Sequence, residues 1–205
     1  MGRLVVAAFL SIDGVMQAPG GPDEDRDGDF PFGGWLVPYA DEVMGEIVTA
    51  AIQQAEAFLL GRRTYEIFAG HWPRVVDPDD PVATALNAKP KYVASRTVGS
   101  VDWNNSTLLE GKVVDAVMRL KKEVAGEIMT QGSCDLIQTL MEHDLVDEYR
   151  LWFFPVVLGQ GKRLFGNGAI PTRLKLLQSL TTGTGALVNT YDADGRPEFG
   201  SFALE

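Results

Sequence analysis

The feature that most constrains the fold is a regular alternation of short apolar runs with amphipathic segments. The apolar, β-branched runs predict buried strands at residues 3–9 (RLVVAAF), 57–60 (AFLL), 91–95 (KYVAS) and 127–131 (EIMTQ). Segments with apolar residues at helical spacing predict helices at residues 41–57, 113–124 and 133–145. Such alternation is typical of an α/β fold with a largely parallel sheet.

The last third of the chain changes pattern. Residues 147–158 (DEYRLWFFPVVL) predict one long strand. Two further strands, at 173–180 and 185–192, are joined by TTGT, which is typical of a hairpin and makes the last strand antiparallel. The long strand is richer in aromatic residues than one buried face requires, so it indicates either a dimer contact or burial on both faces. Composition does not shift along the chain, and we expect a single domain over residues 1–205.

Charge and size exclude several classes of protein. The 205 residues suffice for one substantial core. The net charge of −10 argues against nucleic acid as a partner, because phosphate backbones need a basic face. No apolar run approaches the roughly 18 residues of a membrane span. The N-terminal apolar run is broken by Ser11 and Asp13, which favours a strand over a signal peptide.

The chain has few metal-binding or oxidisable side chains. Cys134 is the sole cysteine, so no intrachain disulfide can form, which fits a reducing cytoplasm. His71 and His143 are the sole histidines, and a metal site built from Cys and His is therefore not expected.

Three of the predicted strand ends carry small or basic hydrogen-bonding residues, which are Gly61-Arg62-Arg63-Thr64, Ser95-Arg96-Thr97 and Gln131-Gly132-Ser133. In open α/β sheets, ligands bind outside the carboxyl ends of the strands. An arginine between two hydroxyls suits a phosphate, and glycines before helices suit a pyrophosphate. Taken singly, the motifs also fit a turn with solvated arginines, a polar turn and a helix N-cap at Ser133. Together they indicate a nucleotide, with Arg62 at the pyrophosphate and Arg63 facing solvent.

Two loops stand out. Residues 20–34 (GGPDEDRDGDFPFGG) predict a long acidic surface loop, and loops of this length within a compact domain are often functional lids. Residues 159–166 (GQGKRLFG) contain glycines and a lysine but lack P-loop spacing, and we interpret them as a loop after the long strand.

The motifs LSIDG (10–14), LLGRRTYE (59–66), SRT (95–97), GS (132–133) and FPVVLGQGKRLF (154–165) give the chain a family resemblance. The chain resembles the dihydrofolate reductase superfamily from about residue 3 to about residue 192, closest to the branch of the C-terminal reductase domain of bacterial riboflavin biosynthesis. The resemblance implies a three-layer α/β fold with about eight strands. It also implies an NADPH-dependent reductase of a pteridine- or pyrimidine-like heterocycle, such as 5-amino-6-(5-phosphoribosylamino)uracil. A homodimer is implied as well.

The resemblance also assigns residues to the cofactor. Gly61, Arg62 and Thr64 would hold its pyrophosphate, and Ser95 and Arg96, beside Thr97, would bind the 2′-phosphate of NADPH. The second glycine turn, Gln131-Gly132-Ser133, would pack with Leu136 on the pyrophosphate and ribose. Ala7 and Ala8 would border the nicotinamide.

Two departures from the folate-reducing members affect the chemistry. Their substrate-binding carboxylate falls at Gly45 here, which argues against folate reduction and leaves Asp13 or Glu46 as candidate proton donor or substrate anchor. The folate-reducing members also have a Gly-Gly pair joined by a cis peptide bond. The aligned pair in this chain is Gln131-Gly132, and we expect a cis bond between these residues as well. The alternative to a reductase is a non-catalytic NADPH-binding protein that retains the fold, and a dimer-forming structural module is a third hypothesis.

Overall fold

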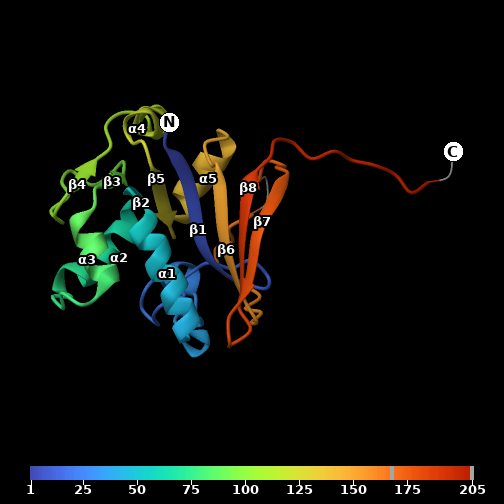
Figure 1. Ribbon diagram of the computed structural model, residues 1–205, viewed down its shortest axis with the longest axis horizontal. Coiled ribbons are helices and arrows are strands. Elements are labelled where there is room, and N and C mark those ends of the chain that lie inside the picture. The colour runs from blue at the N-terminus through green and yellow to red at the C-terminus, as the bar shows by residue number, and fades with distance from the viewer. Residues whose placement is uncertain (167–168, 204–205) are drawn as a thin grey trace.

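The computed structural model describes residues 1–166 and 169–203, whose eight strands form one sheet in the order β4-β3-β2-β5-β1-β6-β8-β7 (Figure 1). The strands are β1 (Arg3–Ser11), β2 (Ala57–Gly61), β3 (Lys91–Ala94), β4 (Ser106–Leu108), β5 (Glu127–Gln131), β6 (Glu148–Phe154), β7 (Leu174–Thr181) and β8 (Leu187–Ala193). Neighbouring strands pair in parallel from β4 to β6, and β8 is antiparallel to both of its neighbours. This confirms the predicted mostly parallel sheet.

Helices cover both faces of the sheet. They are α1 (Glu42–Gln54), α2 (Arg62–His71), α3 (Pro81–Ala88), α4 (Val113–Glu123) and α5 (Cys134–Glu142), with short 3₁₀ turns at Asp27–Asp29, Val37–Tyr39 and Trp72–Arg74. Helices α1 to α3 pack with Phe58 and Leu60 of β2 on one face, whereas α4 and α5 pack with Leu59 on the other. The alternation of buried side chains along β2 thus produces the three-layer arrangement.

A third apolar cluster lies between the end of the sheet and the segment before α1. Trp152 and Phe154 of β6 pack there against Trp35 and Phe30. Burial within the core therefore accounts for these two aromatic residues of β6.

The structure corrects several expected boundaries. Strand β6 ends at Phe154 rather than continuing to residue 158, because Pro155 has no N–H to donate to a ladder. Helix α3 was not expected, although Asp80 accepts hydrogen bonds from the first N–H groups of the helix and Pro81 opens it. Strand β4 has three residues, which is too short to leave a periodic signal.

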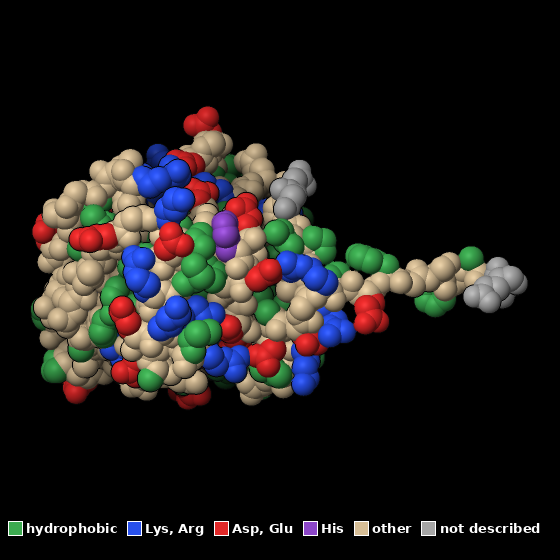
Figure 2. Space-filling view, turned by 90° about the horizontal axis from the view of Figure 1, so that it is seen from above, with side chains coloured by type: hydrophobic (Ala, Val, Ile, Leu, Met, Phe, Trp, Pro, Cys, Tyr) green, Lys and Arg blue, Asp and Glu red, His purple; other side chains and the backbone are tan. Residues whose placement is uncertain are grey.

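The exterior carries mixed charge and one projecting segment. Seen from above in Figure 2, Lys/Arg and Asp/Glu side chains are interspersed, and the C-terminal residues extend from the body as an arm. Phe199 and Phe202 on this arm are exposed. Among the described residues, none of the helices is long and apolar enough to cross a membrane.

Candidate active site

The three sequence motifs meet at one edge of the sheet. Gly61 lies opposite Ala94 in the β2–β3 ladder, so the GRRT and SRT motifs leave the sheet side by side. Strand β5 lies on the other side of β2, and Gln131 is its last residue. Because parallel strands end at the same edge, the sheet brings together residues that are distant in sequence.

Hydrogen bonds directly connect the turn at Gly61, which precedes α2, with the turn at Gly132, which precedes α5. The Gly61 N–H donates to Ser133 Oγ at 2.9 Å, and the Ser133 N–H donates to Thr64 Oγ1 at 3.0 Å. The hydroxyls of Ser133 and Thr64 are also 3.0 Å apart. Thr64 is buried, so this cluster fixes the start of α2 against the start of α5.

Close packing explains the glycines in this cluster. A Cβ at Gly132 would lie 3.1 Å from Thr64 Oγ1, and the backbone there has φ +63°. A Cβ at Gly61 would lie 3.3 Å from the Ser133 side chain. Leu136, predicted as a cofactor contact, is buried on α5 beside Gly61. Both turns therefore bring the backbone closer than other residues would permit.

The same cluster leaves two helix N-termini without side-chain caps. Ser133 precedes α5 in the left-handed conformation, and its hydroxyl is engaged with Gly61 and Thr64 rather than capping the helix. Ser133 thus occupies the predicted N-cap position, but its side chain forms no capping hydrogen bond. Gly61 precedes α2 and has no side chain to cap it. First-turn N–H groups without caps, together with the helix dipoles, favour an anion at both positions.

The predicted arginines lie beside these turns. Arg62 forms an ion pair with Glu66 at 3.1 Å, one turn along α2. Ser95 Oγ accepts the N–H groups of Thr97 and Val98, so it shapes the turn after β3. Arg96, next to it, is exposed.

Strand β1 continues past the end of β5. The last β1–β5 pair joins Ala7 to Gln131, whereas β1 remains paired with β6 as far as Ser11. Ala7 is half-buried, and Ala8 faces the opposite side of the sheet within the core. An opening between strands of this kind is where α/β sheets accommodate ligands.

No cis peptide bond occurs among residues 1–166 and 169–203, so the expected cis bond before Gly132 is wrong. The turn is formed instead by two consecutive residues in the left-handed region, Gly132 at φ +63° and Ser133 at φ +59°. These dihedrals redirect the chain from β5 into α5 without a cis bond.

Asp13 is held by Ser11, two residues away, and by groups of the loop after β6 that are distant in the sequence. Its Oδ1 accepts from Ser11 Oγ at 2.7 Å and from the Leu158 N–H at 3.0 Å. Its Oδ2 accepts from the Gly159 N–H at 2.9 Å and from Arg163 Nη2 at 3.0 Å. The bond from Leu158, followed by those from Ser11 and Gly159, holds the pKa of Asp13 well below its usual range. This geometry favours an ionised anchor for the loop after β6 over a proton donor.

Glu46 does not lie on the buried side of α1. Met44 and Ile52 are the buried residues of α1, and Glu46 is exposed on the opposite side of that helix. Gly45 borders open space, because a Cβ there would meet nothing within 4 Å. Asp13 is thus engaged by the loop after β6, whereas the carboxylate of Glu46 lies on the exposed side of α1.

Arg63 is exposed, as predicted, but it also has partners that the sequence did not indicate. It forms ion pairs with Asp25 and Asp27 of the acidic loop. Lys162, from the loop after β6, contacts the same two carboxylates at 2.5 Å and 2.9 Å. The negative charge of the acidic loop could have predicted from the sequence that some Lys or Arg residues pair with it. Charge alone did not indicate that these residues would be Arg63 and Lys162.

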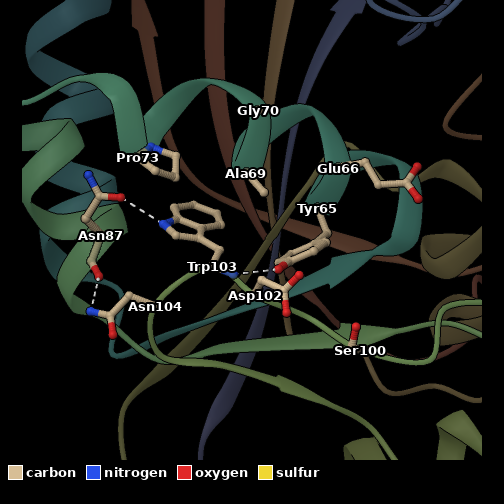
Figure 3. A pocket seen from close by; sticks show the side chains of 10 residues that line it. All are labelled: Tyr65, Glu66, Ala69, Gly70, Pro73, Asn87, Ser100, Asp102, Trp103 and Asn104. Carbon is tan, nitrogen blue, oxygen red and sulfur yellow. Dashed lines mark hydrogen bonds between the residues drawn. The ribbon is translucent and has the colours of Figure 1, made fainter.

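A separate hollow of about 700 Å³ lies along α2 (Figure 3). The Trp103 N–H donates to Tyr65 Oη at 3.0 Å, and Trp103 Nε1 donates to Asn87 Oδ1 at 2.8 Å. Glu66 and Asp102 also line it. The polar groups of Tyr65, Trp103 and Asn87 are thus hydrogen-bonded to one another. None of the predicted cofactor-binding residues lines this hollow.

The sheet order and the glycine turns at its carboxyl edge define a protein with the dihydrofolate reductase-like fold. The solved dihydrofolate reductase of Enterococcus faecalis, complexed with NADP(H), superposes with a TM-score of 0.57 and 9% identity, covering 94% of this chain and 96% of that one. The sequence profile of the RibD C-terminal domain matches residues 3–188. The chain belongs to this family, which confirms the resemblance seen in the sequence.

Two further proteins are similar over most of this chain. The uncharacterized protein YyaP of Bacillus subtilis is 29% identical over 195 residues, which are 94% of this chain and 96% of YyaP. The solved diaminohydroxyphosphoribosylaminopyrimidine deaminase/5-amino-6-(5-phosphoribosylamino)uracil reductase of Thermotoga maritima has a TM-score of 0.64 and 12% identity. It matches over 94% of this chain and 57% of its own length. At this identity the likeness establishes the fold.

Proposed function

We propose that this protein is an NADPH-dependent reductase that transfers a hydride to a pteridine- or pyrimidine-like heterocycle. The observation that carries the proposal is the hydrogen-bonded cluster of Gly61, Thr64, Gly132 and Ser133, which leaves two helix N-termini open at one edge of the sheet. This donor set fits a pyrophosphate, because backbone N–H groups can approach it where side chains are absent. The family of the chain and the uracil reductase activity named for the Thermotoga protein support the same reaction class.

Within this proposal the residues of the chain have distinct tasks. First-turn N–H groups of α2 and α5 bind the pyrophosphate, with Arg62 beside them. Arg96 and the Ser95-Thr97 turn bind the 2′-phosphate, since a guanidinium binds oxyanions bidentately. Leu136 and Gln131 border the ribose and the end of β5.

The nicotinamide end of the cofactor lies where β1 extends beyond the last residue of β5. Ala7 borders the nicotinamide there, and its small side chain leaves room for a flat ring, whereas Ala8, whose side chain is buried on the other face, borders it through its backbone. When bound, the cofactor supplies the hydride, and the protein supplies position and polarity. Asp13 acts as a positioning residue, because it ties the loop after β6 to the end of β1.

The test is cofactor binding by NADPH fluorescence, followed by the Arg96→Ala variant. We expect the dissociation constant for NADPH to rise by about tenfold or more, while that for NADH changes by less than about twofold, because only NADPH carries the 2′-phosphate. The exposed Arg74 provides the matched control Arg74→Ala, which should leave both constants unchanged. Equal losses for the two cofactors would refute the 2′-phosphate assignment.

A non-catalytic NADPH-binding protein is the second candidate. The observation in its favour is that Asp13 is already bonded to the loop after β6 and that position 45 is a glycine rather than a carboxylate. Turnover separates the two candidates. NADPH binding without oxidation in the presence of aminopyrimidine and pterin substrates supports this second function and contradicts the first.

We also propose a homodimer in the reducing cytoplasm. Strand β7 forms an edge of the sheet, and its Leu176, Leu177 and Leu180 are exposed, as partner-facing residues of an isolated chain would be. Light scattering coupled to gel filtration tests this. A monomer at tens of micromolar protein would contradict it.

A further inference from the structure

The acidic loop is held at the opening by cations from two separate segments. We call residues 20–30 the acidic strap. Its Asp25 and Asp27 lie between Lys162, which follows β6, and Arg63, which is the second residue of α2. The buried Gln17 side chain donates to the backbone carbonyls of both aspartates and accepts from the Lys162 N–H. The strap therefore joins the loop beside β1 and β6 to the start of α2.

The two cations have the arrangement of an anion-binding pair. They come from opposite sides of the strand ends, and Arg63 adjoins the uncapped N-terminus of α2. In this structure the carboxylates of Asp25 and Asp27 neutralise the positive charges of Arg63 and Lys162. A phosphate dianion placed between the same cations would face the carboxylates of Asp25 and Asp27, so ligand and strap cannot share the pair without strong repulsion.

We propose that Arg63 and Lys162 form a phosphate-binding subsite, and that Asp25 and Asp27 fill it until a phosphate-bearing ligand displaces the strap. The inference deepens the proposed function, since the ligand is either the diphosphate of the cofactor or the phosphate ester of a phosphorylated heterocycle. The strap competes with the ligand and opens when the ligand enters.

Trypsin provides a direct measure of strap opening. Arg26 is the sole Lys or Arg between residues 4 and 61, so the fragment that ends there identifies cleavage in the strap. We expect Arg63→Gln and Lys162→Gln to speed this cleavage by about fivefold or more, the factor that corresponds to the upper range for a partly exposed ion pair. The neighbouring Arg62→Gln is the matched control, because Arg62 pairs with Glu66 instead, and it should change the rate by less than about twofold.

Ligands are then added to the wild-type protein at constant ionic strength. Inorganic pyrophosphate stands for the cofactor diphosphate and ribose 5-phosphate for a phosphorylated substrate. The one that speeds cleavage at Arg26 identifies the source of the phosphate. Protection of Arg26 by both compounds, or no change with either, overturns the proposal.

Binding gives an independent measure. Asp25→Asn/Asp27→Asn should tighten the binding of the displacing compound by about fivefold, because the internal competitor is removed. Asp77→Asn/Asp79→Asn removes the same charge from another loop and is the control. Equal effects of the two double variants would mean that only net charge matters, which refutes the subsite.

This inference and the proposed function can fail separately. If pyrophosphate opens the strap but NADPH does not bind, the cofactor assignment fails and the subsite stands. If NADPH binds and none of the phosphate compounds changes cleavage at Arg26, the subsite fails and the cofactor assignment stands.

Discussion

Replacing Thr64 by valine tests whether the hydrogen-bonded cluster organises the site. Valine preserves the size and β-branching of threonine but cannot accept a hydrogen bond. The Ser133 N–H, 3.0 Å from Thr64 Oγ1, would lose its acceptor, and the Ser133 hydroxyl would lose its contact at the same distance. Gly61 would keep its bond to Ser133 Oγ.

The magnitude follows from these two contacts. A neutral hydrogen bond contributes about 1 kcal/mol net, and an unsatisfied buried donor costs about 1–3 kcal/mol. Ser133 is half-buried, so water can partly replace the lost acceptor, and we expect the free energy of unfolding to fall by about 2 kcal/mol. For a chain of this size, that lowers Tm by about 4–8 °C.

Urea titration followed by circular dichroism measures the free energy of unfolding, and differential scanning calorimetry measures Tm. Thr64→Ser retains the hydroxyl and loses one methyl group, which costs about 1 kcal/mol. A double-mutant cycle with Ser133→Ala should give a coupling of about 1 kcal/mol between the two side chains. The reasoning is refuted if Thr64→Val lowers stability by no more than Thr64→Ser does, or if the coupling is absent.

Three further predictions concern other parts of the chain. Asp13→Asn should lower the free energy of unfolding by about 2 kcal/mol at pH 7. This difference from wild type should shrink below about pH 4 in urea titrations, because the lowered pKa of Asp13 gives stability that is lost on protonation. Gly132→Ala should cost about 1–2 kcal/mol and weaken NADPH binding, because its φ is positive and the new Cβ meets Thr64; fluorescence titration and thermal melts test both effects. Burial lowers the pKa of Lys91 to about 8 from 10.5 in the unfolded chain, which therefore binds more protons between these pH values. Unfolding free energy should thus rise by up to about 2 kcal/mol from pH 7.5 to 9.5 relative to Lys91→Met, and parallel pH curves would contradict this.

The sequence determined the elements with strong local signals. The strand at 127–131 has the predicted bounds, and the sheet with its antiparallel C-terminal strand follows from periodicity and the hairpin. The positions of GRRT, SRT and QGS at strand ends were also local features. Their convergence at one edge follows from parallel pairing, so the sequence indicated the candidate site before the structure located it.

The tertiary structure decided which partner each polar side chain takes. Asp13 is anchored by groups about 145 residues away, Ser133 bonds to Gly61 across the sheet edge, and Arg63 bonds to the acidic strap. Each of these side chains has several chemically equivalent partners in the sequence. Packing selects among them, because a hydrogen bond or ion pair forms where backbone and core place donor and acceptor within about 3 Å of each other. The sequence thus determined the fold and the edge that carries the site, whereas the assignment of Asp13 as an anchor and of Arg63 as a strap contact required the folded chain.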